Sequence, residues 1–279
     1  MPQIDRKNRR FRRGIYVLPT LFTIGTIFCG FYAIVSTLKG EFDLAAIAIG
    51  LAVVCDGLDG RIARLTNSTS EFGVQIDSLA DVMTFGMAPA VLAYVWGLKS
   101  IAPTYPPYAK HVQQIGWIVC FAFVICGAMR LARFNIQSSK PQASQGPSAK
   151  KSFVGMPIPA GAGLIAAIVH FIPDPIDHWL LGAFWNVLVG FLAFLMISTI
   201  RYPSFKQVDL RSRRSYVNAC LLALLVASIY LYSQIMLLLL AALYASSGLT
   251  TKIYHLVRRK NEAILTSPDT LLPRHVDGD

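Results

Sequence analysis

Long apolar segments constrain this chain more than any other feature. A stretch of about 20 apolar residues is long enough to cross the hydrocarbon core of a bilayer as a helix. Eight such segments can be drawn along the 279 residues, and they predict an all-α, polytopic transmembrane bundle of about eight helices: 15–38, 42–65, 73–98, 112–134, 157–172, 179–200, 216–232 and 234–256. The last two segments almost join near Ser233, so a single kinked helix is an alternative there.

Composition excludes several other classes of protein. Only 15% of the residues are charged, against about 25% in a soluble domain. The net charge of +11 could suggest nucleic-acid binding, but the basic residues lie between apolar blocks and not on one soluble face. The five cysteines form no CxxC pair, which favours small buried side chains over disulfides or a thiolate metal site.

The basic residues also predict the topology. With eight spans and both termini in the cytoplasm, all of the 26 Lys and Arg residues except Lys39, Lys99 and Lys110 fall on the cytoplasmic side, as the positive-inside rule requires. We therefore expect a basic cytoplasmic segment at 1–14, a transmembrane domain at 15–256 and a poorly ordered cytoplasmic tail at 257–279. The basic segment can bind anionic headgroups or act only as a topology signal. Four aromatic residues are expected to anchor the membrane interface: Tyr94, Trp96, Trp117 and Trp179.

Four carboxylates interrupt the apolar segments at Asp56, Asp59, Asp77 and Asp81. Charged groups at membrane depth are costly and mark functional sites. Each pair has helical spacing, three or four residues apart, and therefore shares a face. The polar stretch 66–70 allows the two helices to run antiparallel, which would bring the pairs together. Divalent cations are the simplest means of keeping such a group ionised, and oxygen ligands suit Mg²⁺ or Mn²⁺.

Intramembrane aspartates also occur in proton and cation pathways. An ion-coupled transporter is therefore an alternative function. Transporters usually place such sites near the midplane of broken, repeated helices, whereas this cluster lies at one end of its helices and the chain has no evident repeat.

The spacing of residues 56–81 resembles a family signature. The segment reads DGLDGRIARLTNSTSEFGVQIDSLAD, and it resembles the D-x-x-D-G-x-x-A-R, eight residues, G-x-x-x-D-x-x-x-D pattern of the CDP-alcohol phosphatidyltransferases. Eight fixed positions with fixed gaps are far more specific than a lone glycine motif.

The resemblance implies roles for these residues. Asp56, Asp59 and Asp77 would hold metal, with two ions of Mg²⁺ or Mn²⁺ expected, and Asp81 would be the general base and could also touch metal. The nucleotide diphosphate would lie against a second set: Gly60, Ala63, Arg64, Gly73 and Thr23. The phosphatidylserine synthase branch of this family usually carries Pro-Asn-x-x-Thr in its first helix; Pro19 and Thr23 match this pattern here, but Thr20 stands in place of the asparagine and has no amide.

Other segments resemble the phosphatidylserine synthase branch of the family: FGMAP at 85–89, RLARFN at 130–135, FVGMPIPA at 153–160 and IRYPSFK at 200–206. The branch implies CDP-diacylglycerol and L-serine as substrates and CMP as a product. A serine carboxylate needs a donor, and the candidates are Arg130, Arg133, Asn135, Arg201 and Lys206. Each basic residue among them could instead be a topology or headgroup charge.

The remaining expectations concern partners and location. The resemblance implies a homodimer among membrane lipids, in a bacterial inner membrane, with the active site facing the cytoplasm. A sister transferase acting on glycerol phosphate, inositol phosphate or choline is an alternative. A phosphorylated acceptor would need a denser basic pocket, and choline would need an aromatic cage.

Overall fold

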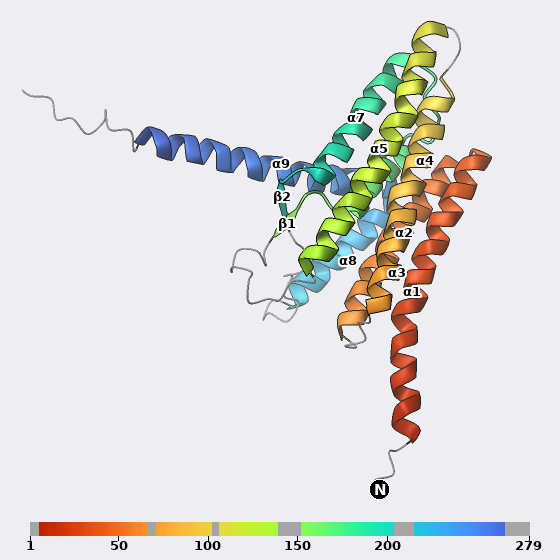
Figure 1. The fold of residues 1–279 in the computed structure, drawn as a ribbon, viewed down its shortest axis with the longest axis vertical. Coiled ribbons are helices and arrows are strands. Elements are labelled where there is room, and N and C mark those ends of the chain that lie inside the picture. The colour runs from red at the N-terminus through yellow and green to blue at the C-terminus, as the bar shows by residue number, and fades with distance from the viewer. Residues whose placement is uncertain (1–5, 66–70, 102–105, 139–151, 204–214, 266–279) are drawn as a thin grey trace, which may run out of the picture.

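The computed structural model describes residues 6–65, 71–101, 106–138, 152–203 and 215–265. Helices dominate these ranges, as the sequence predicts (Figure 1). Their bounds are α1 Arg6–Lys39, α2 Phe42–Leu65, α3 Glu71–Asp81, η1 Val82–Met87, α4 Ala88–Tyr94, η2 Val95–Lys99, α5 Pro106–Ser138, α6 Ile158–Phe171, α7 Trp179–Ile197, α8 Ser215–Leu231 and α9 Ser233–Leu265. Two short strands, β1 Ser152–Val154 and β2 Arg201–Pro203, complete the described elements.

The third apolar segment is one continuous helical rod made of four consecutive elements, α3, η1, α4 and η2. From Glu71 to Lys99 the chain stays helical, and η1 and η2 are stretches of wider π-helix. Counting this rod once, the eight predicted segments correspond to eight helical rods in the described ranges. The bundle is therefore all-α apart from the two three-residue strands.

Two boundaries differ from the expected ones. The break at Tyr232 separates α8 from α9, so the alternative of a single kinked helix is wrong. Helix α9 also continues to Leu265, so the first part of the region expected to be a poorly ordered tail is helical. Residues 266–279 lie outside the described ranges.

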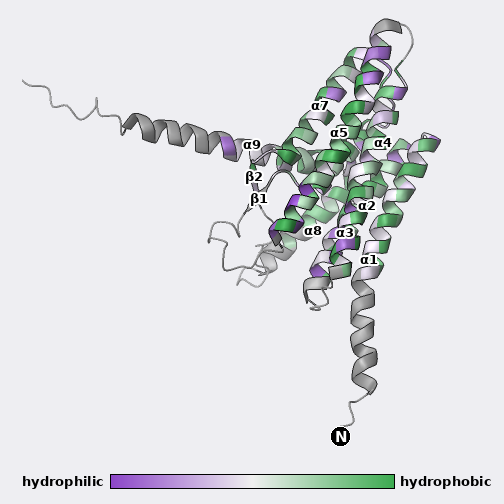
Figure 2. Cartoon of the chain, in the orientation of Figure 1, coloured by the Kyte–Doolittle hydropathy of each residue, from purple (hydrophilic) through white to green (hydrophobic). Residues whose placement is uncertain are grey.

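The surface of the bundle suits a lipid environment. Five helical stretches are long and apolar enough to cross a membrane, within α1, the α3–η2 rod, α5, α7 and α9, and α6 is a shorter apolar helix. Large apolar side chains point outward, among them Phe28, Phe121 and Phe184, each more than half exposed. Apolar residues follow the outer helices along their described lengths (Figure 2). The chain is an integral membrane protein.

Small residues let the inner helices approach closely. Ala33, Ala45 and Ala52 are buried where α1, α2 and their neighbours meet. A Cβ on Gly30 would strike the backbone of Thr84 in η1. In a bilayer, where burying apolar surface adds little, such close backbone packing is a main source of helix association.

One expected interface anchor lies in the core. Trp96 is only 2% exposed and packs edge-to-face on Trp185, with ring centroids 4.9 Å apart. The Trp185 indole donates to the Ala93 carbonyl at 2.9 Å. Trp117, by contrast, is 56% exposed on α5, as a membrane-facing residue should be.

The strand pair joins two distant motifs. Strands β1 and β2 are antiparallel, with Val154 opposite Arg201, so the segments 153–160 and 200–206 meet. Gly155 follows β1 with φ at +81° and donates from its N–H to the Ile200 carbonyl at 2.8 Å. A Cβ at Gly155 would also run into the Met196 carbonyl.

Gly155→Ala is expected to destabilise the protein by about 1–3 kcal/mol, because alanine is strained at positive φ and its Cβ has no space. Gly163→Ala is the matched control, since Gly163 lies within α6 with open space around it. The measurement is the thermal unfolding midpoint of each variant in detergent. Equal midpoints for the two variants would contradict the expected role of Gly155.

Candidate active site

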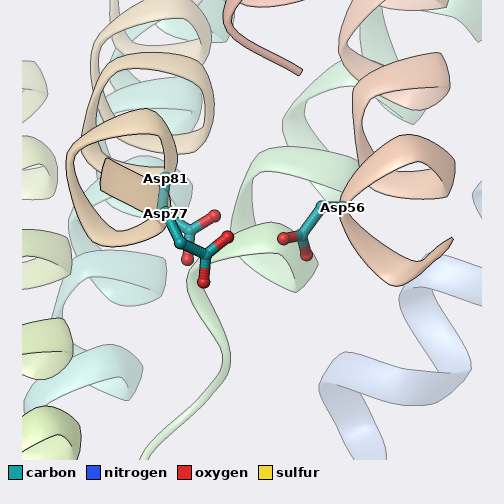
Figure 3. A group of neighbouring side chains, drawn as sticks. All are labelled: Asp56, Asp77 and Asp81. Atoms are coloured by element: carbon teal, nitrogen blue, oxygen red, sulfur yellow. The ribbon is translucent and has the colours of Figure 1, made fainter. Parts of the chain in front are cut away.

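Three carboxylates meet between α2 and α3. Oxygen atoms of Asp56, Asp77 and Asp81 all lie within 4.8 Å of one another, and each side chain is half-buried. Figure 3 shows Asp56 on α2 pointing toward Asp77 and Asp81 on α3. The four-residue spacing puts the latter two on one face of α3. The antiparallel arrangement expected for these helices is what brings the carboxylates together.

Asp59 has a different environment from the other three. Its side chain is 6% exposed, and its carboxylate accepts a hydrogen bond from the Thr23 hydroxyl of α1. It does not belong to the group of three oxygens within 4.8 Å. The sequence predicted four metal-binding aspartates, and the structure groups three of them and attaches the fourth to α1.

A change of helix type follows the site immediately. Asp81 ends α3, and the π-helical η1 begins at Val82. Such π segments within α-helices occur often at functional sites. The wider turn changes the direction of the residues after Asp81, where Thr84 donates to the Thr26 carbonyl of α1 at 3.1 Å.

The charges in this region are not balanced. The aspartates are close enough to repel one another. The Arg130 guanidinium on α5 attracts Asp81. Within the described part of the chain, Asp81 Oδ1 and Arg130 Nε are buried and have no hydrogen-bond partner. A cationic ligand would satisfy the carboxylates, and an anionic group would satisfy the arginine.

The residues present fit a divalent cation. Three carboxylate oxygens converge from two helices, and Asp81 also has an oxygen, Oδ1, that is buried without a hydrogen-bond partner among the described residues. Hard oxygen donors of this kind are ligands of Mg²⁺ and Mn²⁺.

The structure separates the candidate acceptor residues. Arg130 is half-buried beside the carboxylates, whereas Arg133 is exposed one turn further along α5. Asn135 donates through Nδ2 to the Ser78 hydroxyl of α3 at 2.8 Å. Arg201 lies in β2, but its side chain is outside the described set, and Lys206 falls in a stretch that is not described.

The candidate nucleotide residues lie on three helices. Thr23 is buried on α1, Gly60 is half-buried on α2, and Gly73 is exposed on α3. Ala63 and Arg64 continue the helix of α2, but their side chains are not described.

Two contacts of the site were not predicted from the sequence. Ser78 lies between Asp77 and Asp81, donates to the Val74 carbonyl at 2.9 Å, and accepts from Asn135. This bond ties α3 to α5 beside the carboxylates. The other is the bond between Thr23 and Asp59. Both join residues far apart in sequence, so local spacing carries no signal for them.

Comparisons with known proteins show which sequences this chain is similar to. The sequence profile described as CDP-alcohol phosphatidyltransferase matches residues 16–195. A Helicobacter pylori protein named CDP-diacylglycerol–serine O-phosphatidyltransferase is 41% identical over 197 residues, covering 70% of this chain and 75% of the relative. Proteins of the same name from Bacillus subtilis and Methanocaldococcus jannaschii are 36% and 34% identical, over 68% and 69% of this chain and 92% and 77% of their own lengths.

Asp56→Asn is expected to raise the unfolding midpoint of metal-free protein by a few degrees, because it removes one of several repelling charges. Added Mg²⁺ or Mn²⁺ should raise the midpoint of the unaltered protein and raise that of the variant less, since a ligand that binds only the folded state stabilises it.

Thermal unfolding with a chelator, and then with each metal, checks both effects. The control is Asp174→Asn, in the exposed loop between α6 and α7. Equal metal responses in all three proteins would rule out a cation site at Asp56.

Proposed function

The chain belongs to the CDP-alcohol phosphatidyltransferase family, and from that premise we propose that it transfers the phosphatidyl group of CDP-diacylglycerol to the hydroxyl of L-serine. The products are phosphatidylserine and CMP. The observation that carries this proposal is the convergence of Asp56, Asp77 and Asp81 oxygens within 4.8 Å in a bundle that can sit in lipid. The names of the relatives support serine as the acceptor.

The carboxylates are proposed to have two roles, metal binding and proton transfer. Asp56, Asp59 and Asp77, with Asp81 beside them, would hold two ions of Mg²⁺ or Mn²⁺. When bound, such ions neutralise diphosphate oxygens and stabilise the leaving phosphate. Thr23 fixes the orientation of Asp59 through its hydrogen bond.

Asp81 is the proposed general base. A hydroxyl is a weak nucleophile near neutral pH, so a carboxylate must take its proton as the new bond forms. The serine oxygen forms a bond to the lipid-attached phosphorus, the bond from that phosphorus to the CMP oxygen breaks, and the serine proton moves to Asp81. Asp81 Oδ1, buried and without a partner in the described residues, is available for this role.

Arg130 is the proposed site for the serine carboxylate. Of the two basic candidates whose side chains the structure describes, Arg130 is half-buried and Arg133 is exposed, and the charge of Arg130 acts on Asp81, so a bound serine would lie between the anion-binding group and the base. Asn135 supports the site through Ser78. Arg201 and Lys206 are the other residues proposed for the serine carboxylate, and the exposed Arg133 is expected to contribute little. Gly60, Ala63, Arg64, Gly73 and Thr23 are proposed to line the nucleotide diphosphate.

We also propose a cytoplasmic active site in a bacterial inner membrane. The support is the basic character of the expected cytoplasmic segments. CDP-diacylglycerol would enter sideways from lipid, and serine from the cytosol. A homodimer is proposed on the family resemblance alone, and the mass of the detergent-solubilised protein by light scattering tests it.

The direct test measures CMP release by purified protein. CDP-diacylglycerol is supplied with L-serine, glycerol phosphate, inositol phosphate or choline, each with and without divalent metal. Serine-dependent, metal-dependent release is expected. Release with another alcohol and not with serine would assign a sister transferase, and ion flux in liposomes with no CMP release would assign a transporter.

Asp81→Asn is expected to lower kcat with serine by about 10²–10⁴-fold, the usual contribution of a positioned base. The amide cannot accept the proton but occupies nearly the same volume, and it removes one of the repelling charges, so the unfolding midpoint should be no lower than that of the unaltered protein. Kinetics and thermal unfolding on the same preparation separate loss of chemistry from loss of fold. Near-normal kcat in a folded variant would remove Asp81 from this role.

Arg130→Gln is expected to raise the KM for serine at least tenfold, since a hydrogen bond to a charged group contributes about 1.5–3 kcal/mol. Arg133→Gln is the matched control, because its exposed side chain lies one turn away on the same helix; its effect should stay below about threefold. Initial rates at varied serine measure both. A larger rise in the KM for serine in Arg133→Gln than in Arg130→Gln would assign the serine carboxylate to Arg133 instead.

A further inference from the structure

Three polar side chains from three helices meet at the start of α9. His170, near the end of α6, is only 7% exposed. Its Nδ1 lies 2.5 Å from Asp43 Oδ1 in the first turn of α2, and its Nε2 lies 2.9 Å from Oγ of Ser233, the first residue of α9. We call these three residues the His170 cluster.

The His170 cluster is separate from the carboxylate site. Asp43 is 13 residues before Asp56 on α2, about 20 Å along the helix. The cluster therefore lies toward the opposite end of α2, and the proposed phosphatidyl transfer makes no use of it. Helix α9 also lies beyond the part of the chain that matches the family profile, which ends at residue 195. The function of the cluster has to be inferred from its own chemistry.

The partners of His170 determine where its proton lies. An ionised carboxylate only accepts hydrogen bonds, so Nδ1 of the neutral ring carries the proton and donates it to Asp43. Nε2 is then the acceptor, and the Ser233 hydroxyl donates to it. A carboxylate on Nδ1 and a hydroxyl on Nε2 is the order of groups by which serine hydrolases activate their nucleophile.

The surroundings of Ser233 suit a lipid substrate. Ser233 is half-buried, and its neighbours Leu231 and Ile235 are 68% and 49% exposed, as large apolar side chains facing lipid are. Under the topology expected from the basic residues, the start of α2 lies at the outer face of the membrane. The polar interfacial region at that face, between water and the hydrocarbon core, is where the ester groups of lipids lie.

Backbone N–H groups at the start of α9 can stabilise the charge that acyl transfer develops on a carbonyl oxygen. N–H groups in the first turn of a helix have no acceptor within that helix. Gln234 directly follows Ser233, and the N–H of the residue after the nucleophile is a donor of this kind in hydrolases whose serine begins a helix. The Met236 N–H already donates to the Tyr232 carbonyl at 3.0 Å, so Gln234 is the expected donor.

We propose that Ser233 is an activated nucleophile that accepts acyl groups from carboxylic esters of membrane lipids, with His170 as general base and Asp43 as the positioning residue that holds the ring. Ser233 Oγ forms a bond to the ester carbonyl carbon, and its proton moves to His170 Nε2. The bond from that carbon to the alcohol oxygen breaks, and the leaving oxygen takes the proton. Water then cleaves the acyl-serine, which releases the fatty acid and returns a proton to Ser233. This activity is separate from the proposed phosphatidyl transfer.

An alkyl fluorophosphonate tests this reactivity, because the Ser233 oxygen would attack its phosphorus and displace fluoride, leaving a stable adduct. Purified protein in detergent is expected to be labelled at Ser233, as located by mass spectrometry of its peptides. Ser233→Ala should abolish the labelling. Ser246→Ala is the matched control, since Ser246 is a more exposed serine of α9 whose hydroxyl donates to the Leu243 carbonyl. Its labelling should equal that of the unaltered protein.

Two further variants test the base and the positioning residue. His170→Gln should slow labelling about 10²–10⁴-fold, the usual contribution of a positioned base. Asp43→Asn should slow it at least about tenfold, because the amide no longer holds the ring in the tautomer that accepts from Ser233. Asp43→Glu should recover part of the rate, since it restores the carboxylate.

Release of 4-nitrophenol from 4-nitrophenyl butyrate is a second readout, expected in the unaltered protein and lost in Ser233→Ala. Absence of labelling in the unaltered protein would overturn the inference, and so would labelling that persists in Ser233→Ala. Equal labelling rates in His170→Gln and the unaltered protein would also overturn it, because the cluster would then only hold three helices together. CMP release from the same preparations reports separately on the proposed function, so the two can fail independently.

Discussion

Several carboxylates held together inside an apolar bundle are the constraint on which the rest of this structure depends. Lipid provides no water to solvate them, so each needs a partner within the protein or a bound cation. Asp59 has its partner in Thr23. Asp56, Asp77 and Asp81 repel one another, and the charge of Arg130 offsets part of this repulsion at Asp81. Without a cation, the repulsion between these carboxylates destabilises the bundle. A bound divalent ion offsets that repulsion, so binding of the ion is coupled to the stability of the bundle.

The helix packing keeps these groups in place. Small residues allow α1, α2 and η1 to lie close together, and a few hydrogen bonds between distant segments fix their relative positions. Asn135 to Ser78 joins α5 to α3, and Thr84 to Thr26 joins η1 to α1. The carboxylates thus lie on a framework of rigid helices, as a site with demanding geometry requires.

Much of this could be predicted from the sequence because its signals are local. Apolar length gives the helices, and spacings of three and four residues place Asp77 and Asp81 on one face. The pairing of Asp59 with Thr23 and the burial of Trp96 against Trp185 could not be predicted, because they depend on which helix packs beside which. The π-helical turns after Asp81 likewise lack a composition signal. For the same reason the spacing alone could not divide four similar aspartates into a group of three and a hydrogen-bonded fourth.

Helix α2 also has a consequence for how the protein is made. It carries Asp43, Asp56 and Asp59 along with basic residues, and within the described residues it is not among the helices apolar enough to cross a membrane by themselves. Charged residues at a helix centre oppose release from the translocon into lipid. Helix α1 is synthesised before α2, and its Thr23 hydroxyl donates a hydrogen bond to Asp59. The two helices are therefore expected to leave the translocon as a preassembled hairpin, with the bond between Thr23 and Asp59 formed during synthesis.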